Sequence, residues 1–112
     1  MEANEFSLAF FRESANGDKQ FMKYILLLTA RELQQYFEQL TMAVQEGHTE
    51  QIRRAVHKLR PHLESLQAVE LEKLMRQLAN APSPPSAELL QTFQQKAALL
   101  CSMIQQAADH ET

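Results

Sequence analysis

Residues 53–66 read RRAVHKLRPHLESL, and the fold predicted for the chain follows from the pattern within this stretch. One set of apolar side chains recurs at steps of four and three residues: Ile52, Val56, Leu59, Leu63 and Leu66. This spacing is typical of a helix with one face buried against other helices. Because each residue advances by about 100°, His57 points almost directly away from that face. The stretch therefore predicts a bundle helix that presents one histidine to water.

Basic side chains gather around His57. Four of the eleven lysines and arginines fall within eight residues with no acid between them, although the formal net charge is −3: Arg53, Arg54, Lys58 and Arg60. The residues one or two turns from His57 on its side of the helix are Arg53, Arg60, Pro61 and Glu64. Arg54 lies close to them, whereas Lys58 lies toward the flank. We expect a positive surface patch around the histidine.

A histidine in such a patch can act as a nucleophile. A neutral imidazole nitrogen attacks phosphorus, and nearby cations favour the neutral ring. The same cations stabilise the negative charge of an arriving phosphoryl group, and Arg60 and Arg53 are the best placed to do so. On the residues alone a second interpretation stays open, in which the patch is an ordinary solvated helix face.

Length and composition limit the class of protein. A chain of 112 residues is predicted to form a single domain over residues 1–112, with its core at about residues 5–108. It is 45% hydrophobic with two glycines and no tryptophan, which is typical of a helical bundle. Two glycines cannot build a glycine-rich phosphate loop, so we expect no ATP-dependent kinase activity and no enzyme. The net negative charge argues against a general nucleic-acid binder.

Metal and membrane sites also lack support. Cys101 is the only cysteine, which excludes an internal disulfide or a cysteine-based zinc site, and its apolar neighbours predict a buried thiol. His57 and His62 are five residues apart and diverge around a helix, so we expect no metal and no cofactor of the chain's own. Residues 24–30, the longest apolar run, are too few to span a bilayer, and no signal peptide is recognisable. We expect a soluble cytoplasmic monomer.

Turn and cap signals set the first helices. A short helix is expected at residues 5–14, followed by a turn at residues 16–18. Asp18 is the predicted N-cap of a long helix from 19 to about 46, which Gly47 ends in the left-handed conformation. The core residues predicted on this long helix are Phe21, Ile25, Leu28, Leu33, Phe37, Leu40 and Val44.

The second half of the chain divides in the same way. Thr49 is expected to cap the helix that carries the histidine, and that helix breaks near residues 66–68. A shorter helix follows, and the prolines of residues 81–86 then form a connector. Ser86 caps the last helix, and residues 109–112 are expected to fray. The predicted fold is all-α, an antiparallel up-down four-helix bundle with a short extra N-terminal helix.

The order of these features resembles the histidine-containing phosphotransfer (HPt) domain family of bacterial two-component phosphorelays. The family motif reads approximately H-x-L-K-G-x-x-x-x-L-G-A, and residues 55–68 read AVHKLRPHLESLQA. The positions that match are His57, Leu59, Leu66 and Ala68. The resemblance implies that His57 is the phospho-acceptor of signal transduction and that Arg60 stands where the family has a phosphate-attending lysine.

The resemblance also implies partners. These are response-regulator receiver domains, whose phosphorylated aspartate and bound Mg²⁺ supply the rest of the chemistry, and a hybrid histidine kinase. The residues around the acceptor that would dock to such a partner are Arg54, Lys58, Pro61 and Glu64.

Besides Arg60, the chain departs from the family pattern at three positions near the expected acceptor. Pro61 stands where the family usually has glycine, and it lacks the N–H that would bond to the carbonyl of His57, so we predict a kink there. A helix that stops at Arg60 is the rival interpretation. His62 replaces a small residue and Gln67 replaces the glycine of the turn. Pro61 and His62 motivate one alternative, a pseudo-HPt adaptor that binds partners without being phosphorylated. Another alternative is an unrelated helical bundle whose local sequence mimics the motif.

Overall fold

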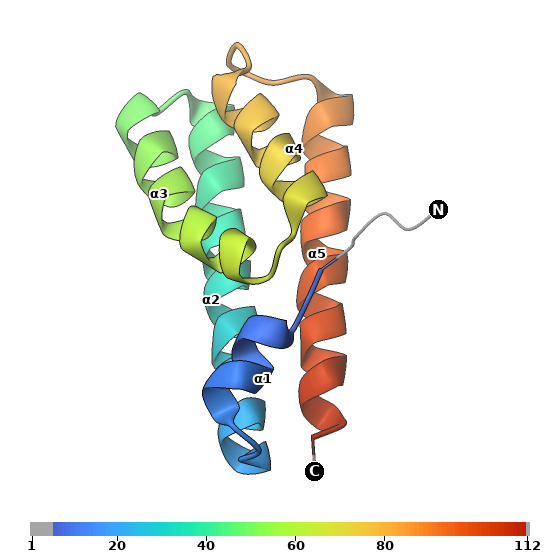
Figure 1. Cartoon of the computed structure of the whole chain (residues 1–112). Helices are drawn as coiled ribbons and strands as arrows, with labels where there is room; N and C mark the ends of the chain where they lie inside the picture. The colour runs from blue at the N-terminus through green and yellow to red at the C-terminus, as the bar shows by residue number, and fades with distance from the viewer. Residues whose placement is uncertain (1–5, 112) are drawn as a thin grey trace.

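A computed structural model describes residues 6–111 of the chain. Five helices follow one another: α1 (Ala9–Ala15), α2 (Lys19–Glu46), α3 (Thr49–Ser65), α4 (Val69–Asn80) and α5 (Ala87–Asp109) (Figure 1). Across residues 6–111 there is no β-strand. The predicted all-α class is confirmed.

The two longest helices, α2 and α5, lie side by side along the molecule (Figure 1). Helices α3 and α4 pack beside their upper halves in the view of Figure 1, and α1 lies against the lower part of α2. Large side chains with no more than 2% exposure come from each of the four longer helices: Leu26, Leu33, Leu40, Leu59, Leu63, Leu71, Met75, Leu78, Phe93, Leu100 and Ile104. Phe37 and Phe93 meet edge to face, with centroids 5.5 Å apart. Within the described range, no helix is long and apolar enough to cross a membrane.

Side-chain caps fix the starts of the two long helices, as the sequence predicts. The Asp18 carboxylate accepts a hydrogen bond of 3.0 Å from the N–H of Phe21. The Ser86 hydroxyl accepts one of 3.1 Å from the N–H of Leu89. Each cap satisfies a backbone donor that has no partner inside the helix. Gly47 ends α2 with φ of 75°, the left-handed conformation that glycine adopts without strain.

Some predicted details are wrong. The residue before α3 is His48 rather than Thr49, and its side chain makes no capping hydrogen bond. Phe21 is 41% exposed instead of buried, because the buried face of α2 passes through Met22 and Leu26, one position further along. Residues 25 and 28 are half-buried, while the other four predicted core residues of α2 are buried. The first helix begins at Ala9, and residue 5 of its predicted range lies outside the described residues.

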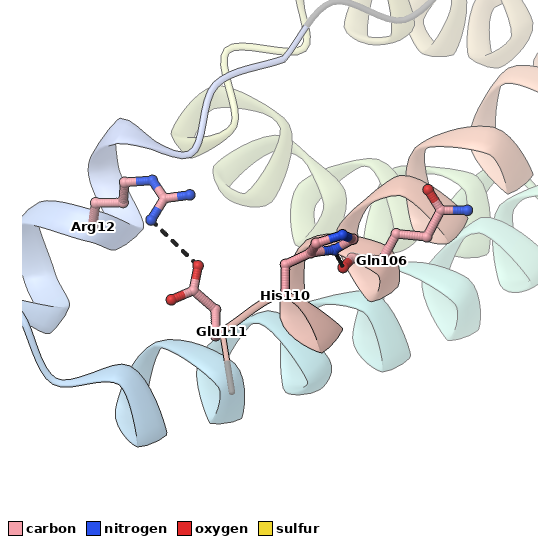
Figure 2. A network of polar contacts seen from close by, with 4 residues as sticks. All are labelled: Arg12, Gln106, His110 and Glu111. Atoms are coloured by element: carbon pink, nitrogen blue, oxygen red, sulfur yellow. Dashed lines mark hydrogen bonds and ion pairs between the residues drawn. The ribbon is translucent and has the colours of Figure 1, made fainter.

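Two polar contacts join the segment at the end of α5 to the rest of the molecule and to its own helix (Figure 2). An oxygen of the Glu111 carboxylate lies 3.3 Å from Nη1 of Arg12, which joins the segment after α5 to α1. The His110 ring places Nδ1 2.7 Å from the carbonyl oxygen of Gln106. The expected fraying of residues 109–111 stays a prediction, and residue 112 lies outside the described range.

Helix α3 continues through Pro61 to Ser65, so the rival interpretation of a helix that stops at Arg60 is wrong. The predicted kink stays a prediction. Gln67 then takes φ of 55°, and the N–H of Ala68 bonds to the carbonyl of Leu63 at 2.9 Å. The left-handed turn after α3 thus forms without the glycine that favours it.

Candidate functional site

His57 lies in the middle of α3 with its side chain exposed. It faces water because the opposite side of the helix is buried: Ala55 is 2% exposed and Leu59 is fully buried. Ile52 and Val56 pack against the same core as half-buried residues. The apolar spacing of α3 therefore fixes the direction in which the histidine points, as the sequence predicts.

Four side chains of α3 line a shallow hollow of about 260 Å³ around His57. They are Arg53, Arg54, His57 and Lys58, and we call this feature the His57 hollow. Residues three and four positions apart are neighbours on a helix surface, so Arg54 and Arg53 lie one turn before the histidine, and Lys58 directly follows it in the sequence. An anion that enters the hollow meets positive charge and an imidazole together.

One carboxylate already engages both arginines of the hollow. Glu50 accepts a hydrogen bond of 2.5 Å from Nη2 of Arg53. Its other oxygen lies 3.6 Å from Nε of Arg54. The hydrogen bond from Arg53, and then the positive charge of Arg53, lower the pKa of the exposed Glu50 carboxyl. Both guanidinium groups therefore carry a counterion within the same helix, in its first turn, where an acid also complements the helix dipole.

Arg60 does not line the His57 hollow. Its Nη2 atom lies 3.9 Å from Oε2 of Glu64, one turn further along α3. Pro61 is exposed next to it. The structure thus brings Arg53, Arg54 and Lys58 to the histidine, and leaves Arg60, Pro61 and Glu64 on the adjoining surface. The roles predicted for these residues stay predictions.

Lys58 differs from the other three cations of α3. Within residues 6–111 it forms no ion pair with a carboxylate; its Nζ lies 5.5 Å from the centroid of the Tyr36 ring on α2. That ring is half-buried and also lies 6.1 Å from the ring of His62. His62 in turn places Nε2 3.3 Å from a carboxylate oxygen of Glu32. Lys58 is therefore positioned by an aromatic ring from a neighbouring helix.

A second hollow, of about 300 Å³, lies between α2 and α3 on the other side of Lys58. Met42 lines it and is 57% exposed. Arg54 and Lys58 border both hollows, so an exposed apolar side chain lies next to the cationic surface. Such a combination suits contact with another protein.

Sequence reasoning missed three residues of this surface. Glu50 stands three and four positions before the two arginines, so helical spacing alone was enough to find it. Tyr36 and Met42 belong to α2, and their place beside Lys58 depends on how α2 packs against α3. No local pattern in one sequence contains that information.

No group of three or more His, Cys, Asp or Glu side chains able to hold a metal ion occurs in the described part of the chain. Cys101 is 7% exposed and borders a groove between α2 and α5. Its predicted burial is confirmed.

Burial raises the pKa of the Cys101 thiol from 9.0 to about 11. We expect its reaction with a disulfide reagent at pH 8 to be slower than in the unfolded chain by at least about tenfold, because the thiolate is the nucleophile. The unfolded chain loses this proton first as pH rises. The thiol's contribution to stability is therefore full below pH 9.0 and is lost as pH approaches 11. Reaction rates with and without denaturant measure the first effect. Equal rates would contradict it.

Comparison of the chain with protein-family models, curated proteins and solved structures finds no match.

Proposed function

We propose that this protein is a histidine phosphotransfer carrier of a phosphorelay, in which His57 takes a phosphoryl group from one receiver domain and passes it to another. The observation that carries this function is the exposed His57 in a hollow formed with three cations. Motif positions His57, Leu59, Leu66 and Ala68 of the HPt family support it. The finer fold belongs to the same proposal: α2 to α5 form an antiparallel up-down four-helix bundle, and α1 is the extra helix.

The transfer needs little chemistry from this chain. The unprotonated ring nitrogen of His57 attacks the phosphorus of an aspartyl phosphate. The bond between phosphorus and the carboxylate oxygen breaks, and its electron pair returns to the aspartate. The ring, now cationic, loses the proton of its other nitrogen to water. The partner's Mg²⁺ and the cations beside His57 balance the charge of the phosphoryl oxygens.

The partners follow from this chemistry. They are receiver domains of response regulators and of a hybrid histidine kinase, in a bacterial cytoplasm, and the carrier acts as a monomer. The surface that meets them extends from the His57 hollow to Met42 on one side and to Pro61 and Glu64 on the other.

A label-transfer experiment tests the function. The protein is incubated with a panel of receiver domains phosphorylated with radioactive phosphate. We expect an acid-labile, base-stable label on the chain, located at His57 by mass spectrometry. A chain that stays unlabelled by every receiver contradicts the proposal.

The second candidate is a pseudo-HPt adaptor. It is favoured by the ion pairs of Arg53 and Arg54 with Glu50 and of Arg60 with Glu64, which reduce the charge available to a phosphoryl group. An adaptor would bind a receiver without accepting label. Binding measured by calorimetry alongside the transfer experiment separates the two functions.

A further inference from the structure

We infer that Lys58, held in place by the ring of Tyr36, is the cation that binds the transferred phosphoryl group at His57. The inference rests on the proposed function and assigns a role that the sequence favoured for Arg60. Lys58 is the binding residue and Tyr36 the positioning residue.

The four cations on α3 differ in whether they have a carboxylate partner. Arg53 and Arg54 share Glu50, and Arg60 pairs with Glu64. Across the described residues Lys58 has no carboxylate partner. A phosphoryl group that binds Arg53, Arg54 or Arg60 lies beside a carboxylate and meets the repulsion between the two anions. Lys58 binds it without that repulsion.

Lys58 and Arg60 also differ in their position relative to the His57 hollow. Lys58 lines the His57 hollow, and Arg60 does not. The ammonium group carries three donors on a flexible stem, so it can direct one of them toward a phosphoryl oxygen while the backbone stays fixed. Lys58 also borders the hollow that contains Met42, so a docked partner would cover its stem and remove water from the ammonium.

The Tyr36 ring that contacts Lys58 is itself held in place by its neighbours. Tyr36 is half-buried on α2, with the His62 ring on one side of it and the Lys58 ammonium over its face. The contact of His62 with Glu32 fixes that neighbour across the α2–α3 interface. Tyr36 therefore keeps Lys58 near the hollow at a reduced cost in side-chain entropy.

Potassium phosphoramidate tests this role without any partner protein. The ring nitrogen forms a bond to phosphorus as the P–N bond of phosphoramidate, protonated on nitrogen, breaks and ammonia leaves. Phosphorylation of each histidine is followed by mass spectrometry under non-acidic conditions. His48, which is exposed and lies outside the hollow, serves as the reference within the same molecule.

We expect His57 to react faster than His48 in the wild-type chain. Lys58→Gln should lower the rate at His57 about tenfold and leave that at His48 unchanged, as for the loss of one hydrogen bond to a charged group. Lys58→Arg should retain most of the rate. Arg60→Gln, the matched control, should change it less than twofold.

Tyr36 is tested by a pair of variants. Tyr36→Phe keeps the ring face and should keep the rate at His57, whereas Tyr36→Leu should lower it in the same direction as Lys58→Gln. Thermal unfolding checks that both variants fold. The double variant with Lys58→Gln should be no slower than Lys58→Gln alone, because Tyr36 acts through Lys58.

The outcomes separate the two proposals. Equal rates at His57 in wild-type and Lys58→Gln chains, or a larger loss from Arg60→Gln, overturn the role of Lys58 while the carrier function stands on the receiver experiment. A wild-type His57 that reacts no faster than His48 also overturns it. Labelling by receivers that is absent altogether overturns the carrier function instead.

Discussion

A His57→Gln chain is expected to accept no acid-labile phosphate from any phosphorylated receiver. Glutamine has no ring nitrogen with a free electron pair, so the bond to phosphorus cannot form. The loss should be complete within the detection limit of the label, the largest functional effect expected of any single substitution here. The fold should be unaffected, because His57 is exposed and surface substitutions change the free energy of unfolding by less than about 0.5 kcal/mol.

The matched control is His62→Gln, five residues further along the same helix. His62 contacts Glu32 and the ring of Tyr36, so its loss should reduce stability slightly and leave the label in place. Thermal unfolding and circular dichroism of both variants verify the fold. Label that persists on His57→Gln and disappears from His62→Gln would move the acceptor to His62 and contradict the assignment.

The helices were predictable because local signals set them. Asp18 and Ser86 cap α2 and α5, Gly47 ends α2, and the prolines of residues 81–86 separate α4 from α5. Each signal acts within a few residues of the backbone group that it satisfies. The buried side of α3 was predictable for a related reason, since its polar and apolar residues fall on opposite faces.

Contacts between helices decide which apolar residues of α2 are buried, and the sequence alone did not predict this correctly for Phe21. Phe21 was predicted to be buried because it is large and apolar, but α2 is rich in apolar residues on several sides. Which of these sides faces the core depends on how α1, α3 and α5 pack against α2. Helical spacing supplies the period of the pattern and not its phase when many apolar residues compete.

The same limit applies to the candidate site. The exposed histidine and the surrounding basic residues follow from α3 alone, and the structure places Arg53, Arg54 and Lys58, but not Arg60, in one hollow with the histidine. The contact of Lys58 with an aromatic ring does not follow from α3 alone, because Tyr36 reaches Lys58 from α2. Glu50 and Glu64, which engage the arginines, lie on α3 itself, and within residues 6–111 Lys58 has no carboxylate partner.

Pro61→Ala is expected to raise the free energy of unfolding by roughly 2 kcal/mol. Proline inside a helix costs about 3 kcal/mol relative to alanine, and part of that cost is already offset because the ring restricts the unfolded chain. Alanine restores the backbone N–H that proline at position 61 cannot supply to the carbonyl of His57. For a chain of this length the gain corresponds to a rise in Tm of about 8 °C.

Pro61→Gly, which installs the residue of the HPt motif, should raise stability by only about 1 kcal/mol, because glycine itself is unfavourable in a helix. The control is Pro82→Ala in the connector, where no helical hydrogen bond is regained and no stabilisation is expected. The predicted order of stability is therefore alanine, then glycine, then proline at position 61, measured by denaturant unfolding. A Pro61→Ala chain no more stable than wild type would mean that α3 carries proline without strain.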